Sequence, residues 1–454
     1  MRPLRDPTRG QGQRPACLSQ VRHPTRKRRQ VLVQKLLGRL PHRQQELIGA
    51  ARVLGNRRRV SVYLVGGPVR DLILRRASAD LDLTVVGDGI AYAKALAAEP
   101  GTRATIHPRF GTAALILRDG LRLDVATARR ERYVHPAALP QVFPGTIRDD
   151  LFRRDFTINA MAVRVAPKGE ELLDLFGGLT DLKRGFLRVL HDESYRDDPT
   201  RIFRGSRYAA RYRLRFSPRD RRLIRNVLAE KVLQRLSRER LFREVKRVFD
   251  EATPEAALRI LQDRGVLKAL DPALVVDQGA FAQMRSVRRA WQRYNRRGIS
   301  STPPLWRVYL LVLLRSVPAR VRRRVGEHLG LKGPPLDALM TELRDFAFLQ
   351  EQLEEGSLRA SRLRYLLDRA SADLRILLWA SGARRVRHSV ERYLTRLASV
   401  RPALTGQDLK KFGFPPGPTY RRILDRLLEG RMEGRLKSRE DEVAFLRRHF
   451  GRPR

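Results

Sequence analysis

The chain has 454 residues, which is enough for two to four domains with a sizeable core. It has no apolar run long enough to cross a membrane, and its single cysteine, Cys17, excludes disulfide scaffolds and cysteine zinc sites, as expected for a protein of the reducing cytoplasm. The formal net charge of +46, from 94 Lys and Arg against 48 Asp and Glu, predicts a polyanionic partner. Nucleic acid is favoured over a membrane surface because the basic residues are spread along the whole chain.

The N-terminal segment, residues 1–40, is expected to form a basic and disordered tail. Its first 30 residues are rich in Arg, Lys and Pro, and Asp6 is their only acidic residue. This composition is similar to that of an organelle transit peptide. An RNA-binding arm or a mis-assigned start codon would account for it equally well.

A strand followed by two glycines and a helix is predicted next. The apolar run Tyr63-Leu64-Val65 stops at Gly66-Gly67, and residues 69–74 can start a helix. Glycines let the backbone turn sharply and bring N–H groups close to a phosphate at a helix N-terminus. A Gly-Gly pair alone is most often a simple turn, so a phosphate-binding role needs support from the acidic residues of the next strand.

Two acidic residues lie on the next predicted strand. Asp80 and Asp82 are separated by one residue, so both side chains point to the same face of a strand. A later strand, residues 121–125, carries Asp124 and can bring a third carboxylate to the same place. Carboxylates of this kind suit Mg²⁺, so the pattern predicts a two-metal phosphoryl-transfer site. The alternative is a pair of solvated acids at a strand edge.

Four further segments carry motifs of a known family: residues 153–162 (RRDFTINAMA), 174–182 (DLFGGLTDL), 197–208 (DDPTRIFRGSRY) and 236–241 (LSRERL). With the glycine turn and the acidic pair, they occur in the order found in the class II CCA-adding tRNA nucleotidyltransferases and bacterial poly(A) polymerases of the polymerase-β superfamily. The chain resembles this family over about residues 60–250.

The resemblance implies an α+β fold, with a small mixed α/β nucleotidyltransferase head followed by an all-helical neck, body and tail. We expect the head at 41–186, the neck with its nucleotide-selecting helix at 187–270, the body at 271–400 and a tRNA-binding tail at 401–454. The helical spacing of apolar residues after residue 190, as in 256–261 and 308–314, agrees with this division.

The resemblance also implies roles for individual residues. Asp80, Asp82 and Asp124 would be catalytic, with Asp80 and Asp82 as ligands of Mg²⁺. The nucleotide would be bound by Gly66, Gly67, Arg70, Arg154, Asn159, Asp198, Arg201, Arg204 and Arg207. Asp71, Asp155 and Asp197 would orient these side chains, Asp71 by pairing with an arginine and Asp155 as a buried partner of Arg154.

Base selection is predicted from the chemistry of two side chains. A carboxylate only accepts hydrogen bonds and a guanidinium only donates them, so Asp198 with Arg201 complements an amino group beside a ring nitrogen. Cytosine and adenine share that pattern and uracil does not, which predicts selection of CTP and ATP over UTP. The alternative is that Asp198 only caps the helix that begins near Pro199. Capping gives no reason for Arg201, Arg204 and Arg207 to recur at a spacing of three.

Two other segments resemble parts of the family. Residues 131–142 resemble the flexible loop with which members switch from adding C to adding A, although a plain connection has the same composition. Residues 404–409 and 412–418 resemble the tail motif, and we expect them to grip RNA. A structural turn between tail helices is the alternative reading of their glycines and prolines.

The expected function is the addition of CMP and AMP, from CTP and ATP, to the 3′ end of tRNA. An enzyme that adds only the terminal A, or a poly(A) polymerase, would share all of these motifs. A non-catalytic RNA-binding protein is disfavoured because Asp80, Asp82 and Asp124 are all present. A nucleotidyltransferase acting on a small molecule would have no use for a long basic helical half. No sequence pattern specifies an oligomeric state.

Overall fold

The computed structural model describes residues 33–77, 80–98, 101–167, 171–297, 302–356 and 358–451. Packing divides the chain into two units. The first contains the described residues within 1–130, 144–152 and 159–176, and the second those within 131–143, 153–158 and 177–454. Within the described ranges, no helix combines the length and the apolar composition that a membrane span requires.

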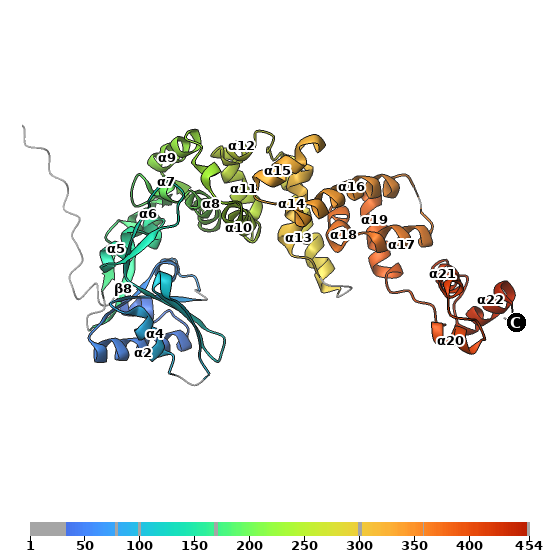
Figure 1. Ribbon diagram of the computed structural model, residues 1–454, viewed down its shortest axis with the longest axis horizontal. Helices are drawn as coiled ribbons and strands as arrows, with labels where there is room; N and C mark the ends of the chain where they lie inside the picture. Colours follow the sequence, from blue (N-terminus) through green and yellow to red (C-terminus); the bar gives the residue numbers. More distant parts are fainter. Residues whose placement is uncertain are drawn as a thin grey trace, which may run out of the picture. The chain divides into compact units, whose positions relative to one another are not determined.

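The first unit is built on a seven-stranded sheet with the strand order β3-β4-β5-β2-β1-β8-β9. Figure 1 labels β8 of this sheet and the helices α2 and α4. Its strands are β1 (Ser61–Val65), β2 (Leu81–Val86), β3 (Arg103–His107), β4 (Thr112–Ile116), β5 (Arg122–Thr127), β8 (Ala162–Ala166) and β9 (Leu172–Leu173). β2 and β5 run parallel, and the other neighbouring strands are antiparallel. This parallel pair positions the acidic residues.

The helices of this unit include α2 (His42–Arg58), α3 (Gly67–Ile73), α4 (Gly89–Leu96) and α5 (Ile147–Phe152). α2 packs against β1 and β8, and α4 packs against β2, β4 and β5. The two helices also contact each other, and the Tyr92 hydroxyl on α4 donates to the Ala51 carbonyl on α2 at 2.5 Å. Both therefore cover the same face of the sheet.

The second unit is almost entirely helical. It contains α6 (Gly178–Arg184), α7 (Ser194–Asp197), α8 (Thr200–Tyr212), α9 (Pro218–Ala229), α10 (Arg238–Phe249), α11 (Pro254–Asp263), α12 (Val266–Leu270), α13 (Gln278–Arg296), α14 (Leu305–Arg315), α15 (Arg322–His328), α16 (Pro334–Glu354), α17 (Ala360–Arg369), α18 (Ala372–Trp379), α19 (Arg384–Arg392), α20 (Gly406–Lys411), α21 (Pro418–Met432) and α22 (Arg439–Phe450). The short strands β10 (Phe186–Leu187) and β11 (Arg215–Phe216) pair in parallel. A second ribbon, β6 (Arg129–Arg132) with β7 (Gln141–Pro144), lies where the chain passes between the units.

One continuous apolar core runs through the second unit from residue 137 to residue 397. Within it α8 packs on α10 and α11, and α13 packs on α14 and α18. Helices α20 to α22 have a core of their own, which includes Leu409, Ile423 and Leu427. These three helices therefore have their own apolar core, while α21 also packs against α17.

The α+β architecture predicted from the sequence is confirmed. The sequence predicts no strand after residue 190, but β11 (Arg215–Phe216) lies beyond that point and pairs with β10. Packing assigns 131–143, 153–158 and 177–186 to the second unit, although the sequence suggests that they belong to the head. In the predicted tail, residues 33–37 are helical, and Val33 and Leu36 are buried. Residues 1–32 lie outside the described part of the chain.

Candidate active site

The acidic residues of the first unit meet through the register of β2 and β5. Asp82 on β2 lies directly opposite Asp124 on β5 in the parallel pair. Asp80 lies two residues before Asp82, just outside the strand, and is exposed. Residues i and i+2 of an extended chain project to one face, so all three carboxylates lie on the same face of the sheet. We call Asp80, Asp82 and Asp124 the acidic cluster.

Arg122 contacts this acidic cluster, and the sequence analysis did not include it. Its Nε lies 3.1 Å from both carboxylate oxygens of Asp124. Hydrogen bonding to Asp124 raises the pKa of Arg122, and the charges of Asp80 and Asp82 raise it further. Arg122 is therefore within the field of all three acids. Its position two residues before Asp124, on the same strand face, is the signal that would have revealed it.

The donor set fits a magnesium ion that also binds substrate phosphates. In the described part of the chain, no group of three or more His, Cys, Asp or Glu side chains has the geometry of a metal site. Mg²⁺ commonly takes only one or two carboxylates and fills its other positions with water and substrate phosphates. Asp80 and Asp82 can supply that pair, while Asp124 is held by Arg122.

The glycine turn joins β1 directly to α3. Gly66 has φ +74° and ψ −131°, a conformation that residues with a Cβ rarely adopt. Its N–H donates to the Met161 carbonyl, which ties the turn to the segment that enters β8. The turn and the following helix therefore have the backbone arrangement predicted from the sequence.

Arg70 is buried beneath this turn. Its guanidinium donates to both carboxylate oxygens of Asp71, at 3.0 and 2.9 Å, and to the Asn159 side-chain oxygen at 2.5 Å. Arg70 is only 4% exposed, and Asn159 is only 6% exposed. The structure thus joins three predicted site residues in one network, in which Arg70 fixes its neighbours rather than presenting an open cation.

On α8, the helix predicted to select the nucleotide, the hydrogen-bond partners of Arg201 are neutral. It donates to the Ser194 hydroxyl and, at 2.9 Å, to the backbone carbonyl of Arg153. The side chain is only 4% exposed. Among the described residues it makes no ion pair with Asp198, so the two predicted base-selecting groups are held independently.

Asp198 is fixed at the start of α8. Its Oδ1 accepts from the Thr200 N–H at 3.1 Å and from the Thr200 hydroxyl at 2.6 Å. Arg240 on α10 donates to the same oxygen at 3.0 Å. Pro199, and not Asp198, is the N-cap residue of α8, although Asp198 still satisfies the N–H of the first helical residue.

The other arginines of α8 lie in ion pairs within the second unit. Arg204 contacts the buried carboxylate of Asp155 at 2.8 Å, and this charge raises the pKa of Arg204. Burial lowers the pKa of Arg207, which lies 3.9 Å from both Glu244 and Glu251. The structure provides Arg204 as a partner of Asp155, and the pairing of Asp155 with Arg154 stays a prediction.

Two remaining predicted residues also lie in the second unit. Arg154 is half-buried in the segment before Asp155. Asp197 ends α7, and burial raises its pKa. Arg154 and Asn159, predicted to face the same nucleotide, belong to different packing units.

Arg240 also holds the segment that resembles the switching loop. Besides Asp198, it donates to the Ala137 carbonyl at 2.5 Å. At the start of the loop, Arg153 pairs with Glu131 at 3.2 Å. The loop and the start of α8 thus share one arginine. Sequence spacing does not reveal this, because Arg240 lies 103 residues from Ala137 and 42 from Asp198.

Comparison with known proteins identifies relatives of the whole chain. Residues 62–188 match the poly A polymerase head domain. The chain is 33% identical to the A-adding tRNA nucleotidyltransferase of Geobacter sulfurreducens, over 92% of this chain and 48% of that protein. It is also 33% identical to the CC-adding tRNA nucleotidyltransferase of Deinococcus radiodurans, over 86% of this chain and 89% of that protein. The chain therefore spans about half of the first relative and most of the second.

The fold has a solved counterpart of similar extent. The Thermotoga maritima CCA-adding enzyme, complexed with tRNA, superimposes with a TM-score of 0.72 and 29% identity, over 91% of this chain and 98% of that one. The relatives thus cover the helical half as well as the sheet. From the motifs, the acidic cluster on β2 and β5, and these matches, we conclude that the chain is an enzyme of the tRNA nucleotidyltransferase family.

Proposed function

We propose that this protein adds CMP and AMP, from CTP and ATP, to the 3′ end of tRNA without a template. The observation that carries the proposal is the parallel register that sets Asp82 beside Asp124, with Asp80 on the same face. Paired carboxylates on one face of a sheet are suited to phosphoryl transfer through bound metal ions. The tRNA in the complex of the Thermotoga relative, together with the charge of +46, supports tRNA as the substrate.

The chemistry follows from these carboxylates. Asp80 and Asp82 would hold Mg²⁺, which supplies Lewis-acid activation of the RNA 3′ hydroxyl and neutralises charge on the triphosphate. Asp124 would complete the acidic cluster, and Arg122 would balance the charge of Asp124 until substrate binds. None of these roles requires a histidine base or a side-chain nucleophile.

Base choice would use the oxygen of Asp198 that its protein contacts leave available. Within the described residues, the hydrogen bonds of Asp198 all go to Oδ1, so Oδ2 can accept from the amino group of cytosine or adenine. Arg201 uses two of its five N–H donors on protein partners, which leaves donors for a ring nitrogen. Uracil would meet mismatched groups at both places.

A second candidate is the addition of the terminal A alone. It is favoured by one observation, the A-adding name of the Geobacter relative, which aligns with 92% of this chain. The same residues would act in both reactions, because adenine shares the hydrogen-bonding pattern of cytosine.

Purified protein offered three tRNA substrates, ending before the CCA, after one C and after CC, tests both candidates. With CTP and ATP together, we expect all three to be completed to CCA. Extension of only the CC-ending tRNA, by one A, would establish the A-adding alternative. Long A tracts on unrelated RNA would indicate a poly(A) polymerase. An absence of incorporation in every reaction, from folded protein supplied with Mg²⁺, would refute the proposal.

A further inference from the structure

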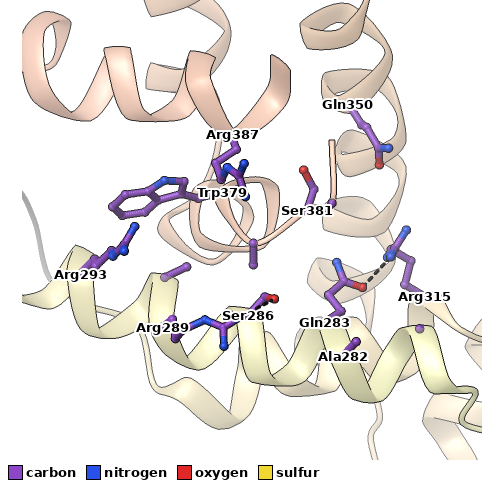
Figure 2. A pocket seen from close by; sticks show the side chains of 14 residues that line it. Ala282, Gln283, Ser286, Arg289, Arg293, Arg315, Gln350, Trp379, Ser381 and Arg387 are labelled. Carbon is purple, nitrogen blue, oxygen red and sulfur yellow. Dashed lines mark hydrogen bonds between the residues drawn. The ribbon is translucent and has the colours of Figure 1, made fainter. Parts of the chain in front are cut away.

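A pocket of about 480 Å³ lies in the helical unit, and its lining includes none of the residues assigned to the candidate active site. One face of α13 forms a wall of it, with Gln283, Ser286, Arg289 and Arg293 at the spacing of successive helical turns (Figure 2). The opposite side comes from the end of α18 and the start of α19. Its volume is in the range of sites that hold a small molecule.

The pocket is strongly basic. Arg289, Arg293, Arg315 and Arg387 line it, and none of its described lining residues is acidic. Arg315 donates to Gln283 at 2.5 Å and Arg289 to Ser286 at 3.2 Å, so these two are oriented by neutral groups (Figure 2). Among the described residues, no carboxylate lies within ion-pair distance of any of the four. An anion entering the pocket would therefore meet guanidinium groups without a paired carboxylate, although the charge of Asp277 acts on Arg315.

A buried hydroxyl lies beside the pocket. Ser381 lines the pocket and is only 7% exposed. Its Oγ is buried and has no hydrogen-bond partner in the structure. Such a group is costly to bury unsatisfied, and most buried polar atoms have a partner. Because the Oγ has no solvent exposure, a ligand oxygen in the pocket would reach it only after a local movement of residues 380–382.

The aromatic residue of the pocket favours a phosphoryl group over a base. Trp379 is only 3% exposed, and its indole N–H donates to Glu391 at 3.0 Å. The guanidinium of Arg297 lies 5.3 Å from the centre of the indole ring. The indole is therefore already covered and cannot act as a stacking platform for a base. The groups that remain available to a ligand are guanidinium N–H donors and a hydroxyl, which together suit phosphate oxygens.

We propose that this pocket binds a phosphoryl group, at a site separate from the candidate active site. Its volume and its cluster of arginines favour a free compact ligand, such as pyrophosphate or a nucleoside triphosphate, as the source. A backbone phosphate of bound RNA has the same chemistry and is the other possible source. The proposal goes beyond the proposed function and does not depend on it.

The test is calorimetric titration of the full chain with pyrophosphate, and separately with tRNA, in EDTA. We expect Arg289→Ala with Arg387→Ala to weaken pyrophosphate binding about tenfold or more, because each removes a charge-assisted contact. Arg285→Ala, on the same helix but outside the pocket, is the matched control and should change affinity less than about twofold. If pyrophosphate does not bind but the double variant selectively loses tRNA affinity, the phosphoryl group is that of RNA.

Ser381→Ala gives an independent readout. Removing an unsatisfied buried hydroxyl should raise the melting temperature of the ligand-free protein, whereas loss of the ligand's partner should weaken pyrophosphate binding several-fold. These opposite changes would not arise from a purely structural serine. Unaltered pyrophosphate and tRNA affinities in the folded double variant and in Ser381→Ala would overturn the proposal.

Discussion

Replacing Arg201 with alanine should relax nucleotide choice. The guanidinium is buried on α8 and donates to the Ser194 hydroxyl and the Arg153 carbonyl. In the proposed function, its remaining donors recognise the ring nitrogen of cytosine or adenine. A mismatched buried donor or acceptor costs about 1–3 kcal/mol, which corresponds to a factor of about 5 to 150 in relative incorporation.

The assay measures UTP against CTP incorporation on a tRNA that ends before the CCA. We expect Arg201→Ala to raise the UTP-to-CTP ratio within that range and to lower the overall rate. The variant also leaves the Ser194 hydroxyl and the Arg153 carbonyl without their donor, so the free energy of unfolding should fall by about 1–3 kcal/mol. A thermal melt in the same buffer separates the two effects.

Arg211→Ala is the control on the same helix. Arg211 is exposed, pairs with Glu251 and lies outside the predicted nucleotide residues. Its loss should lower the free energy of unfolding, because the buried Glu251 loses a two-bond partner, but it should leave the UTP-to-CTP ratio unchanged. If Arg201→Ala loses stability but keeps its discrimination, Arg201 is a structural residue and the base-selection argument fails.

Three further predictions test other parts of the molecule. Asp82→Asn should abolish nucleotide addition while tRNA affinity and the melting temperature stay unchanged. The control Asp88→Asn alters an exposed N-cap residue that accepts the Ala91 N–H, and it should remain active. Comparable turnover by both variants would contradict the assignment of Asp82 to the metal site. Deleting residues 400–454, which contain a separate apolar core, should weaken tRNA binding and flatten its salt dependence while ATP binding is kept; an unchanged salt slope would exclude the tail from the RNA contact. Burial lowers the pKa of His191 to about 4, so between pH 6.5 and 4 the folded state binds fewer protons than the unfolded state, and the free energy of unfolding should fall as the pH drops. His191→Gln should flatten this pH dependence in melting experiments. An unaltered profile would show that His191 is not the group responsible.

The shared face of Asp80 and Asp82 was predictable because the two residues are neighbours on one predicted strand. Alternation along a strand places Asp80 and Asp82 on one face from sequence alone. The position of Asp124 beside them depends on the parallel pairing of β2 with β5, which the sequence does not specify and the register supplies. Arg122 was missed although the same two-residue rule applies to it, because a basic side chain was not considered as part of an acidic site.

The contacts of Arg240 were not predictable from spacing. The arginine joins the Ala137 carbonyl to Asp198, and both lie far from it in the sequence. Only the packing of α10 beside α8 brings them together. Sequence patterns describe periodicity within an element, whereas an interaction of this kind depends on how elements are assembled.

The arginine repeat of α8 divides into two groups once the partners are known. Arg204 and Arg207 face the carboxylates of Asp155, Glu244 and Glu251, which compensate their charge. Among the described residues, Arg201 donates only to a hydroxyl and a backbone carbonyl, so its charge has no hydrogen-bonded counter-ion.

A ligand that accepts hydrogen bonds gains most where the donor charge is least compensated, because it need not displace an existing carboxylate. The helix therefore offers one guanidinium suited to recognition and two suited to holding the helix in place. Equal spacing in the sequence does not distinguish them, since the difference comes from acids on other elements. On this reasoning, substitutions at Arg204 and Arg207 should act on stability alone, whereas those at Arg201 should change nucleotide choice as well as stability.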